Sequence, residues 1–456
     1  MPSKRMTPQG ATSEGATSAG PNSAGPNSIR TLVDDCFVVG QTIMAHAEAI
    51  AIFRQRIVGI TPPEAVQLRE LGERILAEPI HVIVPVPAHT NSAVDGFAFA
   101  ADSYDKSNGS QLPVSGRAAA GHALVEAPSR DSAVRIFTGA VMPPGFDTVA
   151  MQEDCTVIGD QVSIPAGLKA GANVRKAGED VASGSVLFQT GHIVRPQDLA
   201  ALASIGRAEA LCFRRLRVAL VSSGDEVVRA AVAKIGPQTL RLGQVFDANG
   251  PMLAGLVALA GAETHDLGVW PDDIDGIAHN LADAAARFDL ILTSGGASKG
   301  DEDHMATAID RLGQRHLWQL AIKPGRPIMF GQIGDRKTVI IGLPGNPVAV
   351  FVCFLMYVFP MIRALSGAPW REPRRYQLPA AFAFKGRKPG RREFWRGMLL
   401  EGPNGQLSVD KFARDGSGLI SGLRAADGLI DIPEDHGDVA LGDIVSFIPF
   451  TEFGIV

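Results

Sequence analysis

The apolar positions between residues 217 and 368 follow two alternating patterns. Short, continuous apolar runs such as "RVALVSS" and "DLILTS" are typical of strands that are buried on both faces. Between them, apolar residues recur at helical spacing, as Ile274, Ile277 and Leu281 do in "DDIDGIAHNLADAAARF". Strands that alternate with helices predict a doubly wound α/β domain, in which a parallel sheet is covered by helices on both faces.

The chain before this α/β region has a different pattern. Apolar residues on repeating faces predict a helix over residues 31–60, and a second amphipathic segment follows at 62–80. From 91 to 176, short β runs such as "AVRIFTG" and "DTVAMQ" alternate with turns, which predicts a small β domain. Residues 177–216 then return to the first domain. We therefore expect 29–90 and 177–216 to form one linker domain, with the β domain inserted into it.

The two ends of the chain are predicted to differ from each other. Residues 1–28 are rich in Gly, Ser, Ala and Pro and lack an apolar segment, so we expect a disordered tail and no secretory signal. Residues 369–456 return to short β runs, which predict a C-terminal β barrel. The most apolar run, 348–362, is shorter than the ~20 residues that span a bilayer, and Pro360 interrupts it. It predicts a buried core helix, and no contact with a membrane is expected.

Composition narrows the class of protein. The 456 residues suffice for about three domains, and 46% hydrophobic with 20% charged residues is typical of a soluble globular enzyme. A formal net charge of -5 gives no reason to expect a nucleic-acid partner. The four cysteines lie far apart and form no CxxC pair or zinc spacing, so we interpret them as free thiols in a reducing cytosol.

Three loops of the α/β region carry the candidate chemistry. They are "SSGDEVV" at 222–228, the glycine-rich segment from Ser294 to Asp303, and "GLPGNPVAV" at 342–350. In open α/β sheets, ligands bind at the carboxyl ends of the strands, where all three loops are expected. The third loop places Asn346 to cap a helix and Pro347 in its first turn, so the free N–H groups of that helix can bind an anion.

Acidic side chains accompany two of these loops. Asp225, Glu226, Asp301 and Asp303 would converge on a cradle that otherwise suits phosphate. Clustered carboxylates are costly unless a cation neutralises them, and Mg²⁺ binds one or two carboxylates together with phosphate oxygens. The hypothesis is that the acids hold the metal and the metal holds the phosphate. The alternative is that the acids only complement the dipole of a helix start.

Cations follow in "AIKPGRPIMFG". Lys323 and Arg326 flank a Pro-Gly turn, where they can grip an oxyanion or remain as two solvated charges. A basic group between residues 385 and 392 is either a solvated face or a docking site for a partner or a phosphate group. Three remote segments, with Asp95, Thr138 and Asp180, are weak signals when each is taken alone.

In combination, these segments are specific. "NSAVDGFA", "FTGAVMPPGFDTV", "AGEDV", "VSSGDEVV", "GQVFDANGPML", "LTSGGASKGDEDH", "AIKPGRPIMFG", "GLPGNPVAVFVCF" and "GRREFWRG" occur in this order. Together they resemble the molybdopterin molybdenumtransferase (MoeA) family, which includes the C-terminal domain of gephyrin. The resemblance covers residues 31–456. It implies an elongated homodimer of four-domain subunits, with residues 217–368 similar in fold to molybdopterin adenylyltransferase.

The implied reaction inserts molybdate into adenylylated molybdopterin, uses Mg²⁺ and releases AMP. Molybdopterin adenylyltransferase is then the upstream partner, and a cytoplasmic location is expected. The resemblance further implies that the α/β domain of one subunit and the inserted β domain of the other form the active site together. Positioning and electrostatic stabilisation would perform the chemistry, because no Ser-His-Asp arrangement or thiolate nucleophile is evident.

The resemblance and the loop positions together assign the site residues. The expected catalytic residues are Asp95, Thr138, Asp180, Glu226 and Asp303. The expected substrate-binding residues are Asp247, Asn249, Ser294, Gly295, Gly296, Ser298, Lys323, Arg326, Pro344, Gly345, Asn346 and Pro347. The expected metal ligands are Glu226, Asp301 and Asp303. Gln319 departs from the family, which often has a basic residue there, so Arg326 or His316 would have to compensate.

Two other functions are alternatives to this reaction. A non-catalytic molybdopterin carrier could have the same fold, but binding alone gives no reason to keep the acids at Asp95, Asp180, Glu226 and Asp303. A metal-dependent nucleotide hydrolase could use the same α/β domain, but it would not need the two β domains. Pterin dependence of AMP release separates these possibilities.

Overall fold

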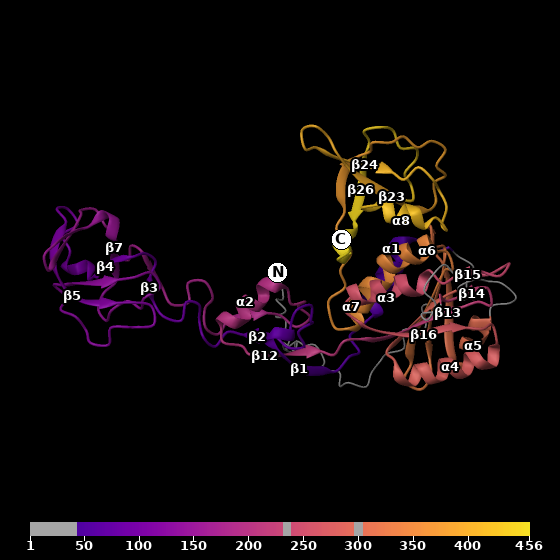
Figure 1. Cartoon of the computed structure of the whole chain (residues 1–456), viewed down its shortest axis with the longest axis horizontal. Helices are drawn as coiled ribbons and strands as arrows, with labels where there is room; N and C mark the ends of the chain where they lie inside the picture. The colour runs from indigo at the N-terminus through magenta and orange to yellow at the C-terminus, as the bar shows by residue number, and fades with distance from the viewer. Residues whose placement is uncertain (1–42, 231–238, 296–303) are drawn as a thin grey trace, which may run out of the picture.

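The computed structural model describes residues 43–230, 239–295 and 304–456. The tail predicted for residues 1–28 lies outside them, as does the first part of the helix predicted over 31–60. In the described part, that helix is α1, His46–Arg56. Figure 1 shows an elongated chain, with one β sheet at one end, paired strands in the middle, and the α/β region with the C-terminal sheet at the other end.

The α/β region contains a six-stranded sheet in the order β16-β13-β17-β21-β20-β18. Its strands are β13 Arg217–Ser223, β16 Glu263–Trp270, β17 Leu290–Ser294, β18 Gly313–Gln319, β20 Pro327–Ile333 and β21 Thr338–Leu343. The first four in spatial order are parallel, as predicted, but β20 is antiparallel to both β21 and β18. The prediction of a wholly parallel sheet was therefore wrong. The short turn between β20 and β21 leaves no room for the crossover that parallel strands require, so these two strands are antiparallel.

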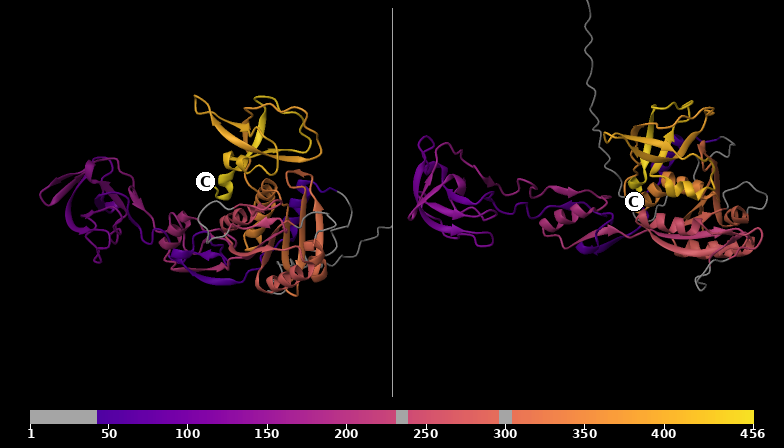
Figure 2. Two further views of the ribbon diagram at one scale, coloured as in Figure 1. Left: turned by 45° about the vertical axis from the view of Figure 1, so that its right-hand side comes forward. Right: turned by 45° about the horizontal axis from the view of Figure 1, so that its top comes forward.

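Helices cover both faces of this sheet, which confirms the predicted layers (Figures 1 and 2). One face carries α4 Ile274–Arg287 and α5 His304–Leu312, whose buried residues pack with Ile291 and Ile340 of the sheet. The other face carries α3 Asn249–Leu259 and the helix that follows β21. In α4, Ile277 and Leu281 are buried, as their spacing predicts.

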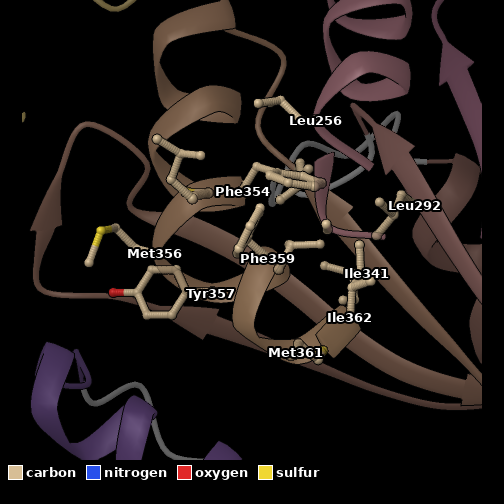
Figure 3. Close-up of a cluster of buried hydrophobic side chains, with 14 of the residues drawn as sticks. Leu256, Leu292, Ile341, Phe354, Met356, Tyr357, Phe359, Met361 and Ile362 are labelled. Carbon is tan, nitrogen blue, oxygen red and sulfur yellow. The ribbon is translucent and has the colours of Figure 1, made fainter. Parts of the chain in front are cut away.

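The helix after β21 is the centre of the largest core. It runs as α6 Pro347–Cys353, a π-helical turn Phe354–Val358 and α7 Phe359–Leu365. Among the described helices, it alone is long and apolar enough to cross a membrane, but 94% of its most apolar window is buried inside the chain. Figure 3 shows its side chains packed against the sheet, with the Tyr357 hydroxyl at the edge of the cluster. The predicted core helix is confirmed.

The middle of the molecule consists of paired strands. The pairs are β1 Pro63–Gln67 with β12 Glu209–Phe213, β2 Ile80–His81 with β11 Val186–Phe188, and β3 Asn91–Ser92 with β10 Val174–Arg175. The short helix α2, Pro196–Ser204, follows β11. The amphipathic segment at 62–80 is not a helix like the one before it: it contains β1, the 3₁₀ turn Leu68–Glu70 and extended chain, because Val66 and Leu76 enter this core by strand pairing.

Two further sheets complete the fold. Residues 96–164 form the order β7-β4-β6-β5-β9-β8, with β4 Gly96–Phe99, β5 Ser110–Ala118, β6 Ala133–Ile136, β7 Thr148–Met151, β8 Thr156–Ile158 and β9 Gln161–Ile164. The C-terminal sheet contains β22 Tyr376–Pro379, β23 Arg392–Glu401, β24 Leu407–Lys411, β25 Gly428–Ile432 and β26 Ile444–Pro449, beside helix α8 Ile420–Ala425. A short strand from the α/β region, β19 Ile322–Lys323, joins this sheet by pairing with β23.

Candidate functional site

The carboxyl ends of β13, β17 and β21 lie side by side, as predicted. Their register aligns Ser222 with Ser294, and Ser294 with Leu343. The amide of Asn249, at the start of α3, donates to Ser294 Oγ at 2.7 Å and to the carbonyl of Gly345 at 2.8 Å. The structure therefore brings these three predicted site residues together, and Asn249 fixes the spacing of two loops.

Asp247 is also close to these loops, but its hydrogen bonds go to protein groups. Its side chain is 3% exposed and accepts hydrogen bonds from Ser222 Oγ at 2.8 Å, the Gly250 N–H at 2.9 Å and Arg229 Nε at 3.2 Å. These contacts fasten the end of β13 to the start of α3. Asp247 thus shapes the loop, and the direct ligand contact expected for it remains a prediction.

A group of carboxylates follows β13. The Glu226 carboxylate lies over Gly224, whose φ of +131° and lack of a side chain make room for it. The N–H of Asp272 donates to Asp225 Oδ1 at 3.1 Å. Partial burial and then the nearby Asp225 carboxylate raise the pKa of Asp272. Asp272 was missed by the sequence analysis; its Pro-Asp-Asp segment after a strand was the available signal.

The Asp225 carboxylate contributes, after burial, to the raised pKa of Asp272, and a divalent cation would relieve this repulsion. No cluster of three metal-ligating side chains is present within residues 43–230, 239–295 and 304–456. The predicted metal ligands Asp301 and Asp303 lie outside the described residues, as do Gly296 and Ser298. The complete metal-ligand set therefore remains a prediction, with Glu226 as its described member.

A cavity of about 470 Å³ lies beside the strand ends, between the α/β region and the C-terminal sheet. The α/β region contributes Gly295, Lys323, Pro324, Gly325, Pro327, Pro344, Gly345, Asn346, Val348 and Ala349. The C-terminal part contributes Phe394, Trp395, Arg396, Lys411, Phe412, Asp415, Gly416 and Ser417. Five predicted substrate-binding residues thus share one cavity. Pro347 and Arg326 do not line it; the Arg326 side chain is exposed.

Three cations line this cavity, and their partners differ. Lys323 Nζ is 3.3 Å from Glu393 Oε2, and Lys411 Nζ is 2.6 Å from Asp415 Oδ1. Arg396 instead donates to the carbonyls of Arg414 at 2.7 Å and Leu419 at 3.1 Å, and in the described chain it forms no ion pair. Burial lowers the pKa of Arg396. Of the three cavity cations, Arg396 is therefore the one whose charge is least neutralised by a neighbouring carboxylate.

Arg396 and Lys411 were missed as site residues, although "GRREFWRG" was recognised as a motif. The sequence does not show that β19 pairs with β23, with Lys323 opposite Glu393. That pairing carries the C-terminal strand to the cavity. The nearby basic group at 385–392 is not simply a solvated face, because the Arg387 side chain is fully buried and Arg392 binds the buried Asp431.

The start of α6 closes one side of the cavity. Asn346 occupies the N-cap position, but its side chain makes no capping hydrogen bond, so the predicted cap was wrong. The N–H of Val348 donates to the carbonyl of Ser417 at 3.0 Å. The backbone of the C-terminal loop thus takes over part of the capping and ties the two sides of the cavity together.

Three other predicted catalytic residues, Asp95, Thr138 and Asp180, do not line the cavity. Thr138 donates to Asp95 Oδ1 from its backbone N–H at 2.8 Å and from its hydroxyl at 2.7 Å. The backbone bond and then the hydroxyl bond hold the pKa of Asp95 below its ordinary value. Asp180 is exposed on a turn beside Val86. The sheet beside Asp95 and Thr138 lies at the opposite end of the molecule from the α/β region with Glu226 (Figures 1 and 2), so a single chain keeps these predicted catalytic residues apart.

Comparison with known proteins accounts for most of the chain. Residues 44–206 match the family model of the MoeA N-terminal region (domain I and II), 219–364 that of a probable molybdopterin binding domain, and 377–450 that of the MoeA C-terminal region (domain IV). A molybdopterin molybdenumtransferase of Haemophilus influenzae is 36% identical over 392 residues, which cover 86% of this chain and 94% of that protein. The corresponding protein of Synechococcus elongatus is 32% identical, over 81% of this chain and 90% of that protein.

A solved structure agrees with this assignment. The crystal structure of the molybdopterin biosynthesis moeA protein from Pyrococcus horikoshii OT3 matches with a TM-score of 0.76 at 26% identity, and covers 90% of this chain and 100% of that chain. The multidomain α/β fold is therefore shared with a protein of that kind. On its three matched regions and its identity to these relatives, the chain belongs to the MoeA family of molybdopterin molybdenumtransferases, and it is a transferase.

Proposed function

We propose that this chain inserts molybdate into adenylylated molybdopterin and releases AMP in a Mg²⁺-dependent reaction. The observation that carries the proposal is the cavity of about 470 Å³, in which cations, a helix start and aromatic side chains meet at the carboxyl ends of the parallel strands. The names of the relatives support the same reaction. The metal dependence and the AMP product go beyond those names.

Molybdate is a dianion, and the cavity offers it suitable partners. Arg396 is held in place by two backbone carbonyls and has no carboxylate partner in the described chain. Lys323 is half exposed, with one ion pair, and Ser417 lines the same wall. A guanidinium and an ammonium that are preorganised in a sheltered cavity bind an oxyanion more strongly than they would in open water.

The pterin part of the substrate would pack against the aromatic side of the cavity. Phe394, Trp395 and Phe412 supply apolar surface there, and the Arg396 guanidinium lies 5.0 Å from the centre of the Phe412 ring. Gly295 and Gly345 allow a close approach of phosphate groups to the backbone at the strand ends. The substrate would thus lie with its anionic end toward the α/β loops.

Glu226, with Asp225 and Asp272 beside it, would hold the Mg²⁺ together with the predicted Asp301 and Asp303. When bound, Mg²⁺ supplies charge stabilisation at phosphate oxygens. The described residues contribute the orientation: Gly224 lets Glu226 fold back, and the Asp272 N–H orients the Asp225 carboxylate. The repulsion of Asp272 by Asp225 and Glu226, which adds to burial in raising the Asp272 pKa, supports a site that is completed by a cation.

A homodimer is part of this proposal. Asp95 and Thr138 flank β4 and β6, and Asp180 follows β10; the sheet with β4 lies at the opposite end of the molecule from the α/β region (Figure 1), so a second copy would have to present these residues. The strand pairs between 63–92 and 174–213 support one linker and dimerisation domain with the 91–176 β domain inserted, and the sheet of 376–449 supports a C-terminal barrel. We also propose a cytoplasmic location and delivery of substrate by molybdopterin adenylyltransferase.

The test is AMP release from adenylylated molybdopterin by the purified protein. The proposal expects release that requires both Mg²⁺ and molybdate. Arg424→Met, an exposed residue of α8 away from the cavity lining, is the matched control for charge removal. Substrate binding without release would favour the carrier, and release without dependence on the pterin would favour a nucleotide hydrolase.

A further inference from the structure

We propose that Glu393 is a positioning residue for the oxyanion site, and that it acts by fixing Lys323 and Trp395 at the cavity wall. Glu393 belongs to β23 and does not itself line the cavity. The inference rests on the proposed function, since it assigns to Lys323 the binding of molybdate.

The backbone brings Glu393 to Lys323. β19 and β23 are parallel neighbours, and their register places Lys323 opposite Glu393. These strands come from different parts of the fold, because β19 precedes the α/β strand β20 whereas β23 belongs to the C-terminal sheet. The turn that carries Lys323 is therefore fastened to the C-terminal sheet by backbone hydrogen bonds before any side chain contributes.

One carboxylate oxygen then serves both cavity residues. Glu393 Oε2 accepts a hydrogen bond from Trp395 Nε1 at 2.8 Å and lies 3.3 Å from Lys323 Nζ. Glu393 is only 5% exposed, whereas half of the Lys323 side chain is exposed. The buried end of the ion pair is thus fixed, and the ammonium group is left with one face toward the cavity.

The other side of Glu393 is enclosed by Arg387. The Arg387 side chain is fully buried, and its Nε lies 3.8 Å from Glu393 Oε1. Its Nη2 group donates to the carbonyls of Arg391 at 2.6 Å and Pro433 at 2.7 Å. Because the guanidinium is locked by these bonds, the carboxylate has little freedom to turn away from Lys323.

Positioning and simple charge make opposite predictions for Glu393→Gln. If the carboxylate only lowers the positive potential of the cavity, then its removal strengthens molybdate binding. If it positions Lys323, then the freed lysine side chain regains rotamer freedom and molybdate binding weakens. The sign of the change in KM for molybdate therefore separates the two roles.

The experiment measures kcat and KM for molybdate in AMP release. For Glu393→Gln we expect KM to rise on the order of tenfold, with kcat much less affected, which is the scale of one hydrogen bond to a charged group. Glu393→Asp keeps the charge but is one methylene too short to reach Lys323, so it should raise KM similarly. Glu434→Gln, which removes an acid that pairs with Arg392 on the same sheet, should leave KM unchanged.

A double variant tests whether Glu393 acts through Lys323. Once Lys323→Met is present, adding Glu393→Gln should raise KM no further, because coupled residues are not additive. An unchanged or lower KM in Glu393→Gln, a wild-type KM in Glu393→Asp, or additive effects in the double variant would each overturn the inference. Wild-type protein that releases no AMP in response to molybdate would instead overturn the proposed function itself. Thermal melting of each variant identifies any that do not fold, and Glu393→Asp then decides.

Discussion

The cavity at the strand ends and the Asp95–Thr138 pair of the β domain are built in opposite ways. The cavity is walled by two parts of the fold, and its groups are tied across the chain by Asn249 to Gly345, Val348 to Ser417 and Lys323 to Glu393. The β-domain pair consists of a single carboxylate oxygen that accepts two hydrogen bonds from one threonine. The first arrangement can enclose a ligand, whereas the second can only present groups to something enclosed elsewhere.

This difference has a consequence for mutagenesis. Residues that line the cavity also hold the two sides of the fold together, so their loss should affect stability as well as activity. Residues of the exposed pair have few structural contacts, so their loss should affect activity alone. All four tryptophans lie at or beyond residue 270, and their fluorescence therefore reports on the α/β and C-terminal parts without a signal from the β domain.

The largest effect is expected for Arg396→Met. Its guanidinium is both the least neutralised cation of the cavity and a donor to two loop carbonyls. Molybdate-dependent AMP release should fall on the order of 100-fold or more, the scale of removing one preorganised electrostatic contact. The melting transition followed by tryptophan fluorescence should also move to lower temperature. Activity close to that of Arg424→Met would contradict the role of the cavity.

Asp95→Asn should reduce activity strongly but leave the melting of the cavity region unchanged. The substitution removes a charge that Thr138 stabilises, and the hydrogen bonds of Asp95 join it to Thr138 and Gln152 of the β domain. Steady-state AMP release and the fluorescence-detected transition measure the two expectations separately. A shift of that transition comparable to the shift in Arg396→Met would remove the distinction between the two regions.

A pH effect is expected in the cavity region. Burial lowers the pKa of His46 to about 4, and its Nδ1 lies 2.7 Å from the Tyr357 hydroxyl (Figure 3 shows Tyr357). The unfolded chain therefore binds a proton more readily between pH 6.5 and 4. The contribution of neutral His46 to the free energy of unfolding is complete above this window and decreases as the pH falls through it. By pH 5 the loss amounts to about 2 kcal/mol. Urea melts at pH 7 and pH 5 should show this loss, and His46→Gln should lack it.

The smallest effect is expected for Asp272→Asn. Because Asp272 repels Asp225 and Glu226, its neutralisation should stabilise the metal-free protein by a few tenths of a kcal/mol. The stabilisation that added Mg²⁺ confers should decrease at the same time. Thermal melting with and without Mg²⁺ measures both changes, and Asp283→Asn on the exposed face of α4 is the control. A larger Mg²⁺ response in Asp272→Asn than in wild type would argue against a cation at these carboxylates.

The sequence predicted the strand-end loops well because their chemistry is local. A buried apolar run followed by glycines and polar residues is visible in a short window, and five of the predicted residues, Gly295, Lys323, Pro344, Gly345 and Asn346, line the cavity. Arg396, Lys411 and Asp272 were missed because they reach the site by long-range pairing. Nothing near Arg396 in the chain indicates that β19 will pair with β23.

The same reasoning explains the errors in the fold. The 62–80 segment has an amphipathic pattern, but its partners at 209–213 lie far along the chain and draw its first residues into a strand. The direction of β20 depends on the shortness of the turn after it, and the apolar run of that strand is equally compatible with either direction. Periodicity thus identified which residues are buried more reliably than which element buries them.

Mixing two strongly impaired variants tests most directly whether the two regions form one site across a pair of chains. Lys323→Met damages the cavity, and Asp95→Asn damages the β-domain pair. In randomly formed mixed dimers, one of the two sites would combine an intact cavity with an intact pair, so about a quarter of wild-type AMP release should return. A mixture of Lys323→Met with Arg396→Met should recover none, because every cavity in it is defective. No recovery in the first mixture, with mixed dimers shown to form, would contradict the shared site.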